Sequence, residues 1–375
     1  MDIGVVKETK PGEARVALTP PAANTLVDDG HRVFLESQAG LKAGFGDEEY
    51  RAVGAQIVYS REEAIGRGEL VLMVSEPAME DYALFQEEQI VNAFLLLAVQ
   101  PHDAVVAMVE KRMTAVGMDI IEDSRGHAPI LRAMSEIGGP LAVQMAARFL
   151  QTSEGGRGIL LGGLPGTAPA HVVILGAGAV GWTAARSALG AGAQVTVFDV
   201  NPEALRRIHD HLGGQAVTRF AHKGTLERSV TTADVLIGAV SVHGARTPAL
   251  IPHSLVTRMK AGSVIVDVAI DAGGCVETSR PTTIAHPTYI EEQVIHCCIP
   301  NLPALVARTA SYVLANTSLP YIRRLAALGA KNAAAADPVL GAGFYIDAGR
   351  IVKANIAAEF ERAERHASKV GEVGR

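Results

Sequence analysis

The sequence has few cysteines, few aromatic side chains and no long apolar run. Cys275, Cys297 and Cys298 are its three cysteines. They lack the C-x-x-C spacing of zinc and redox sites, so we expect free thiols and no metal site. Apolar runs such as Phe94–Val99 are far shorter than the roughly 20 residues of a membrane-spanning helix, and the N-terminus lacks the apolar core of a signal peptide. We therefore expect a cytoplasmic protein with no membrane partner.

The sequence also lacks an excess of basic charge. Lys and Arg number 34 against 40 Asp and Glu, so the net charge is −6. Because binding to nucleic acid needs concentrated positive charge, we expect no nucleic-acid partner. Apolar residues make up 48% of the 375 residues and charged residues 20%. This composition excludes a disordered chain and predicts two or three domains at roughly 150 residues each.

Short apolar runs alternate with helical stretches along most of the chain. A helix is expected from Pro20 to Gly30, a longer one from near Met134 past Phe149, and others after Pro303 and over Lys353–Ala367. The expected strands are 3–6, 32–36, 70–74, 90–96, 114–118, a strand from His171, 195–198, 235–240 and 263–268. Strands alternating with helices are typical of parallel sheets. The sequence therefore predicts an α/β fold with two Rossmann-like, doubly wound domains linked by long helices.

A glycine motif follows the expected strand at His171. Gly176, Gly178 and Gly181 form G-x-G-x-x-G directly before an Ala-rich helix. This context is that of a dinucleotide site, in which glycines allow a tight turn, the approach of a pyrophosphate and close helix packing. The next strand ends in Asp199, where a carboxylate can accept hydrogen bonds from ribose hydroxyls and repel a 2′-phosphate. We therefore predict NAD as the cofactor.

Several separated stretches resemble one known family. They are VKETKPGEARVALTP from Val6, MSE from Met134, GGLPG from Gly162, VDVAIDAGGC from Val266, SRPTT from Ser279, HPT from His286 and NLPALVARTAS from Asn301. Together with the glycine motif, they are similar to the alanine dehydrogenase and pyridine nucleotide transhydrogenase family, and most similar to alanine dehydrogenases.

The resemblance implies a division into three segments. Residues 1–133 would begin a substrate domain, 134–303 would form the NAD-binding domain, and 304–375 would complete the substrate domain, with a cleft between the two domains. It also implies a homo-oligomer, commonly a hexamer. Beyond the glycines and Asp199, the cofactor-binding positions that it implies are Ser135, Ala239, Val240, Ile270, Asn301 and Leu302.

Two catalytic groups of the family are replaced in this sequence. Arg15 matches the arginine that binds the substrate carboxylate, and Asp271 matches the aspartate beside the nicotinamide and the substrate nitrogen. Ser75, however, stands where the family has a lysine that polarises the carbonyl, and Leu96 where it has the proton-transfer histidine. Loss of a general acid or base typically slows a reaction about 10²- to 10⁴-fold.

Other polar side chains could substitute for the missing groups. Arg125 and His127 lie in DSRGHAP and could supply an anion contact or a proton relay, although a solvated loop also explains them. Tyr312 and His243 are further possible donors.

The sequence therefore predicts an NAD-dependent oxidoreductase of amino acid metabolism. Its substrate would be an amino, imino or 2-oxo acid, and Ser75 and Leu96 predict that it is not an efficient alanine dehydrogenase. An already protonated imine needs chiefly hydride and a nearby anion such as Asp271, so imine reduction is one hypothesis. Two alternatives stay open, namely a non-catalytic NAD(H)-binding protein or sensor and an enzyme of NAD-assisted, non-redox chemistry.

Overall fold

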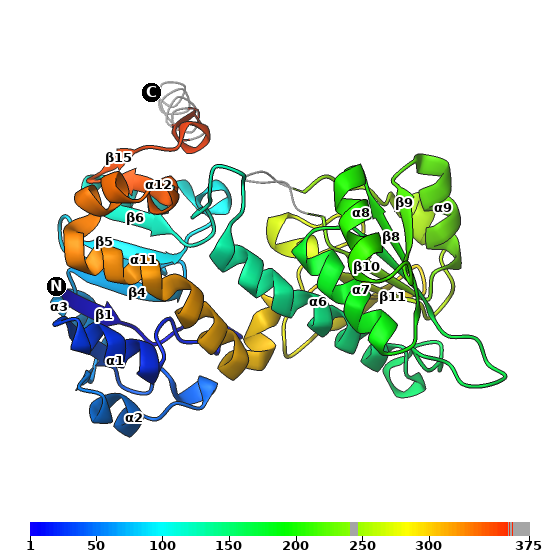
Figure 1. The fold of residues 1–375 in the computed structure, drawn as a ribbon, viewed down its shortest axis with the longest axis horizontal. Coiled ribbons are helices and arrows are strands. Elements are labelled where there is room, and N and C mark those ends of the chain that lie inside the picture. Colours follow the sequence, from blue (N-terminus) through cyan, green and yellow to red (C-terminus); the bar gives the residue numbers. More distant parts are fainter. Residues whose placement is uncertain (241–246, 359, 361, 363–375) are drawn as a thin grey trace, which may run out of the picture. The chain divides into compact units, whose positions relative to one another are not determined.

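A computed structural model describes residues 1–240, 247–358, 360 and 362. The chain divides into two compact units, Met1–Ala133 with Val306–Arg375, and Met134–Leu305 (Figure 1). Each unit is built on its own sheet. Among the described residues, no helix is both long and apolar enough to cross a membrane.

The sheet of the first unit has eight strands in the order β15-β14-β6-β5-β4-β1-β2-β3. The strands are β1 (Asp2–Val5), β2 (Arg32–Glu36), β3 (Gln56–Val58), β4 (Leu70–Ser75), β5 (Ile90–Phe94), β6 (Thr114–Gly117), β14 (Phe344–Asp347) and β15 (Arg350–Ile351). Strands β1 to β6 are parallel in the Rossmann order 3-2-1-4-5-6, whereas β14 and β15 pair antiparallel at one edge. The order reverses between β1 and β4, and such a switch point is where open α/β sheets bind ligands.

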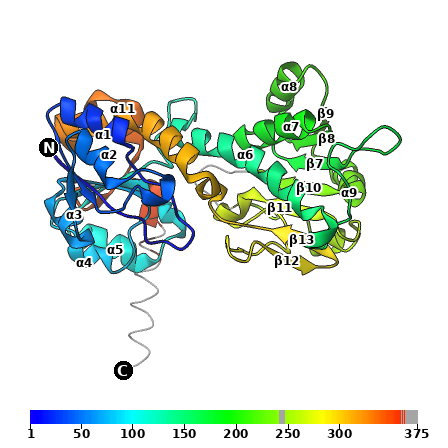
Figure 2. The same ribbon diagram turned by 90° about the horizontal axis from the view of Figure 1, so that it is seen from below.

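Helices cover both faces of this sheet. They are α1 (Pro20–Asp28), α2 (Asp47–Ala52), α3 (Arg61–Arg67), α4 (Asp81–Leu84), α5 (His102–Glu110), α11 (Ala307–Ala336) and α12 (Pro338–Ala342), with short 3₁₀ turns at Leu41–Ala43 and Leu97–Val99. Figure 2 shows α1 and α11 on one face and α3, α4 and α5 on the other. Helix α11 runs through Pro320 and is interrupted at Gly329, so it is much longer than the helix expected after Pro303.

The sheet of the second unit has seven strands in the order β12-β13-β11-β10-β7-β8-β9. The strands are β7 (His171–Leu175), β8 (Gln194–Asp199), β9 (Val217–Phe220), β10 (Val235–Gly238), β11 (Val264–Asp267), β12 (Thr288–Glu291) and β13 (Val294–Cys297). All pairs are parallel except β12 with β13. The parallel strands again follow the Rossmann order, with the switch point between β7 and β10.

The helices of the second unit also lie on both faces of its sheet (Figure 2). They are α6 (Pro129–Phe149), α7 (Ala179–Gly190), α8 (Pro202–His211), α9 (Lys223–Thr232) and α10 (His253–Val256), with 3₁₀ turns at Thr152–Glu154, Val268–Ala272 and Leu302–Val306. An ideal Cβ built on Gly139 of α6 would lie 2.2 Å from Thr183 Oγ1 and 2.5 Å from the Val180 carbonyl oxygen. Helices α6 and α7 therefore pack closely at this glycine.

The predicted α/β fold is confirmed, with several differences in its elements. Helix α6 begins at Pro129 rather than near Met134, since proline is tolerated in a first helical turn. The antiparallel strands β12, β14 and β15 were not predicted. The turn between β12 and β13 places Glu292 and Gln293 at positive φ without the glycine or asparagine that marks such turns. The helix expected over 353–367 lies partly outside the described residues.

Candidate functional site

The glycine motif lies at the switch point of the second unit. Gly176 follows β7 with φ of +100°, and an ideal Cβ on it would lie 2.4 Å from the carbonyl oxygen of Ala239. A Cβ on Gly181 would lie 1.9 Å from the carbonyl oxygen of Gly176. Gly178 precedes α7, and a Cβ on it would meet no atom within 4 Å. Two glycines are therefore required by packing, and the third leaves open space at a helix N-terminus, where a pyrophosphate fits.

Asp199 ends β8 beside this turn. Its Oδ2 accepts a hydrogen bond from the Ala177 amide at 2.6 Å and its Oδ1 accepts one from the Asn201 amide at 2.8 Å. These bonds fix the carboxylate next to the glycine turn, and each oxygen has a second lone pair for a hydroxyl. The residues present therefore fit an adenosine ribose and pyrophosphate, and the open position at Gly178 and the fixed carboxylate of Asp199 carry that conclusion.

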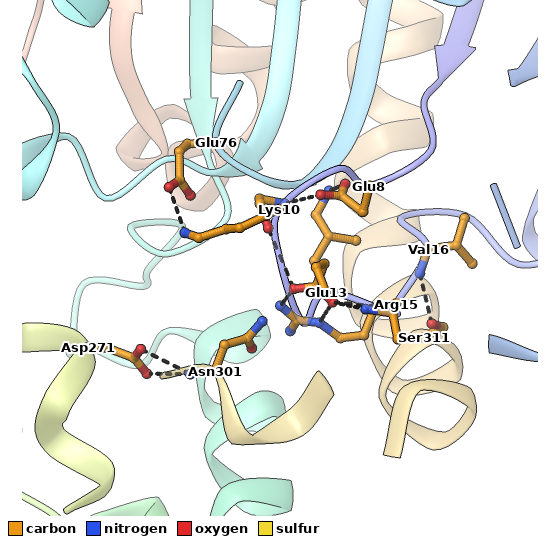
Figure 3. Close-up of polar contacts among 12 residues, drawn as sticks. Glu8, Lys10, Glu13, Arg15, Val16, Glu76, Asp271, Asn301 and Ser311 are labelled. Atoms are coloured by element: carbon orange, nitrogen blue, oxygen red, sulfur yellow. Dashed lines mark hydrogen bonds and ion pairs between the residues drawn. The ribbon is translucent and has the colours of Figure 1, made fainter. Parts of the chain in front are cut away.

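The predicted residues of the next strand ends also come together. Asp271 lies in the 3₁₀ turn after β11 and accepts the Asn301 amide at 3.0 Å through Oδ1 and at 3.4 Å through Oδ2 (Figure 3). Ile270 and Leu302 are buried, whereas Val240 and Ser135, on α6, are half-buried. Asp271 and Asn301 are thus hydrogen-bonded to each other, whereas the side chains of Ile270 and Leu302 are packed in the interior.

Asp267 supports this region and was not predicted. It is buried at the end of β11 and accepts the amides of Ala269, Cys275 and Val276 at 3.1, 2.9 and 3.3 Å. The three bonds organise the turn that carries Asp271. An aspartate between a buried strand and Gly273-Gly274 is the sequence signal that could have identified it.

In the first unit, Arg15 and Ser75 meet around Glu13. Arg15 is buried and forms a bidentate pair with Glu13, Nε to Oε1 at 2.8 Å and Nη2 to Oε2 at 2.7 Å (Figure 3). Ser75, at the end of β4, has its hydroxyl 3.5 Å from Glu13 Oε2. The Ser311 hydroxyl of α11 accepts the Val16 amide at 3.0 Å and so holds the Arg15 loop. Sequence reasoning missed Glu13, although it stands two residues from Arg15.

Glu8 binds the backbone at the end of β4. Its Oε1 accepts the Val74 amide at 2.6 Å and its Oε2 accepts the Ser75 amide at 3.3 Å. The pairing of β4 with β5 shifts register between Leu72 and Ser75. Glu8 therefore binds two backbone amides at the end of β4, the strand in which this irregularity occurs. Burial raises the pKa of Glu8 to about 7.

A second carboxylate organises the end of β5. Asp119 follows β6, accepts the Leu95 amide at 3.1 Å and accepts the Tyr345 hydroxyl at 2.5 Å. Burial raises the pKa of Asp119. Leu96 follows with φ of 46° and ψ of 43°, a left-handed conformation that is uncommon for a leucine. No sequence signal marks this arrangement, because Asp119 and Tyr345 lie far apart in the chain.

His127 lies in an exposed loop. Its Nδ1 is 3.0 Å from Asp123 Oδ2, and Asp123 Oδ1 accepts the amides of Arg125 and His127 at 2.8 and 2.9 Å. The backbone bond from His127 is the main cause of the lowered pKa of Asp123. Arg125 and His127 are both exposed in this loop. Tyr312 packs edge-on against Phe45 at 5.1 Å between ring centroids, and His243 lies outside the described residues.

Comparison with known proteins identifies the family. The alanine dehydrogenase/PNT N-terminal domain matches residues 4–138 and the C-terminal domain of the same family matches residues 142–354. The chain belongs to the alanine dehydrogenase/PNT family. This membership supports the NAD cofactor that the glycine motif and Asp199 predict.

Individual relatives match over nearly their whole length. An alanine dehydrogenase of Mycolicibacterium smegmatis is 39% identical over 361 residues, 96% of this chain and 97% of the relative. One of Methanococcus maripaludis is 41% identical over 358 residues, 95% and 96% of the two chains. A solved L-alanine dehydrogenase is 44% identical with a TM-score of 0.92, covering 96% of this chain and 99% of its own. A transhydrogenase from Sinorhizobium meliloti, 22% identical with a TM-score of 0.80 over 95% of this chain and 100% of its own, shares the fold.

Proposed function

We propose that this protein is an NAD-dependent oxidoreductase of an amino, imino or 2-oxo acid and that it aminates pyruvate slowly. One observation carries this proposal. Strands β4 and β5 are neighbours, and Ser75 and Leu96 lie at or just after their ends. The resemblance to the family implies a lysine and a histidine at these two positions. The glycine motif, Asp199 and Arg15 are nevertheless the residue types that the resemblance implies at their positions.

The residues present suit a substrate that needs little acid–base help. Arg15, oriented by Glu13, binds the substrate carboxylate, since a guanidinium matches a carboxylate in shape and charge. Asp271 stabilises a positively charged substrate nitrogen. NAD accepts or supplies the hydride at the α-carbon when it is bound. Oxidation then removes this hydride and one nitrogen proton from the amine, leaving a C=N bond, and imine reduction is the reverse.

The first test is NADH oxidation with saturating pyruvate and ammonia. We expect the natural protein to turn over far below about 1 s⁻¹, the lower end of ordinary enzyme rates. Ser75→Lys combined with Leu96→His should raise the rate at least about 100-fold, because it restores a cation and a general acid/base. Ser75→Ala with Leu96→Ala changes the same positions without catalytic groups and should stay slow. Ordinary turnover by the natural protein would contradict the proposal.

The second test offers preformed substrates. NADH consumption with a cyclic imino acid, or NAD reduction with the corresponding amino acid, is the expected result. If NADH binds but no amino, imino or 2-oxo acid changes its absorbance at high protein concentration, the proposal fails. The retained cofactor site would then favour the non-catalytic NAD(H)-binding alternative, whereas substrate conversion without net NADH change would favour NAD-assisted, non-redox chemistry.

A further inference from the structure

The buried groups around Ser75 contain more carboxyl groups than cations. We propose that the substrate supplies the missing cation, and that it is a 2-amino acid, or its imine or 2-oxo form, with a second amino group in its side chain. This inference rests on the proposed function and names its substrate class. Glu8 and Ser75 are then the residues that determine specificity.

Three charged side chains beside Ser75 are buried. Glu8, Glu13 and Arg15 are 6%, 2% and 5% exposed. Glu13 is neutralised by Arg15 through both of its oxygens. Glu8 instead accepts hydrogen bonds from the neutral backbone amides of Val74 and Ser75.

The surrounding basic side chains are already engaged elsewhere. Arg61, on α3, faces Glu8 but binds Asp81, with Nη2 to Oδ2 at 2.6 Å, and lies 3.8 Å from Glu36. Lys10 is more than half exposed and pairs with Glu76 at 2.6 Å (Figure 3). Lys42, also exposed, donates to the backbone carbonyl of Glu13 at 3.3 Å. Each of these cations has another acceptor. Arg61 and Arg15 attract Glu8 electrostatically, but among the described residues no cation forms a salt bridge with it.

The raised pKa of Glu8 is consistent with a carboxyl group that has no cation bound to it. Its pKa of about 7 is a consequence of burial first, with repulsion from Glu13 adding to it. Arg15 opposes the shift but is shared with Glu13. An ammonium group bound nearby would favour the charged carboxylate, so binding of the substrate cation and ionisation of Glu8 reinforce each other.

The short side chain of Ser75 places acceptors around one position. Its hydroxyl lies 3.5 Å from Glu13 Oε2, and its own amide is bound to Glu8. An ammonium group beside this hydroxyl would therefore lie near Ser75 Oγ and the carboxyl groups of Glu8 and Glu13. Phe94 pairs with Ser75 in the sheet and lies under the Arg15 guanidinium, 5.8 Å from ring centroid to Cζ, so it offers an apolar wall to the substrate carbons.

Binding of two matched amino acids tests this inference. L-Norvaline is L-ornithine without its δ-amino group, and both are titrated calorimetrically into the NADH-saturated protein, which prevents turnover. We expect ornithine to bind at least 10-fold more tightly, as a hydrogen-bonded charge commonly gives. A smaller ratio overturns the inference.

Variants at residue 75 separate charge from shape. Ser75→Lys supplies the cation from the chain and should abolish the preference for ornithine, whereas Ser75→Ala removes only one acceptor and should reduce the preference without abolishing it. Glu8→Gln should reduce the ornithine-to-norvaline ratio at least 10-fold. Thermal unfolding and NADH fluorescence identify any variant that fails to fold. Equal ratios in Ser75→Lys and Ser75→Ala would overturn the assignment.

Measured rates of NAD reduction distinguish an incorrect substrate class from an incorrect proposed function. NAD reduction with norvaline as fast as with ornithine overturns the substrate class and leaves the oxidoreductase in place. Tight, selective binding of ornithine with no NAD reduction supports the substrate class and contradicts the oxidoreductase.

Discussion

Two buried carboxyl groups bind the backbone at the ends of β4 and β5, beside Ser75 and Leu96. Glu8 binds the amide of Ser75, and Asp119 binds the amide that precedes Leu96. Each comes from the strand next to the one it holds, Glu8 after β1 and Asp119 after β6. Both strand ends are therefore fixed by hydrogen bonds to buried side chains, whatever side chain residues 75 and 96 carry.

Glu8 should make the stability of the protein depend on pH. Its folded pKa, about 7, is above the ordinary 4.5. Its contribution to stability is therefore fully present below about pH 4.5 and is lost as pH rises through about 7. Relative to the natural protein, Glu8→Gln should gain about 2 kcal/mol of unfolding free energy between pH 5 and pH 8. Urea unfolding at both pH values measures this, and a pH-independent difference would contradict it.

Asp199 should contribute to both the affinity for NADH and the choice of cofactor. Asp199→Asn removes the negative charge and should weaken NADH binding about 10-fold, the value of a charged hydrogen bond. NADPH should be affected less, because its 2′-phosphate no longer meets a carboxylate. Fluorescence titration with both nucleotides measures the change. Asp210→Asn, on the exposed face of α8, is the control, and an equal effect there would exclude a specific role for Asp199.

Among the elements, helix α6 packs closely against α7 at one glycine, Gly139. Gly139 lies against the backbone and Thr183 of α7, whereas its neighbour Gly138 has only Val268 Cγ1, at 3.7 Å, near an ideal Cβ. Gly139→Ala should lower the unfolding free energy by about 1–3 kcal/mol through overpacking. Gly138→Ala should be neutral or stabilising by up to about 1 kcal/mol, since alanine favours helix. Denaturant unfolding of both variants compares them, and equal effects would show that the contact is not tight.

At the scale of the whole molecule, we expect several copies of the chain to assemble. The resemblance to alanine dehydrogenases predicts a homo-oligomer, commonly a hexamer. Leu160 and Leu164, 63% and 66% exposed in the loop between α6 and β7, are apolar side chains that a second chain could cover. Sedimentation velocity should give a mass that is a multiple of 39.3 kDa, and six times that value for a hexamer. The mass of one chain would contradict the prediction.

Local sequence was sufficient for the parallel sheets and the dinucleotide motif. Alternating apolar strands and helices predict α/β order, and the spacing of the glycines before a helix, with Asp199 ending the next strand, predicts a dinucleotide site. Ser75 and Leu96 could likewise be located near the ends of expected strands from the sequence alone. Tertiary structure alone decided how these positions are held. Glu8, Asp119 and Tyr345 meet the strand ends from elsewhere in the chain, and desolvation, which raises the pKa of Glu8, exists only in the packed fold.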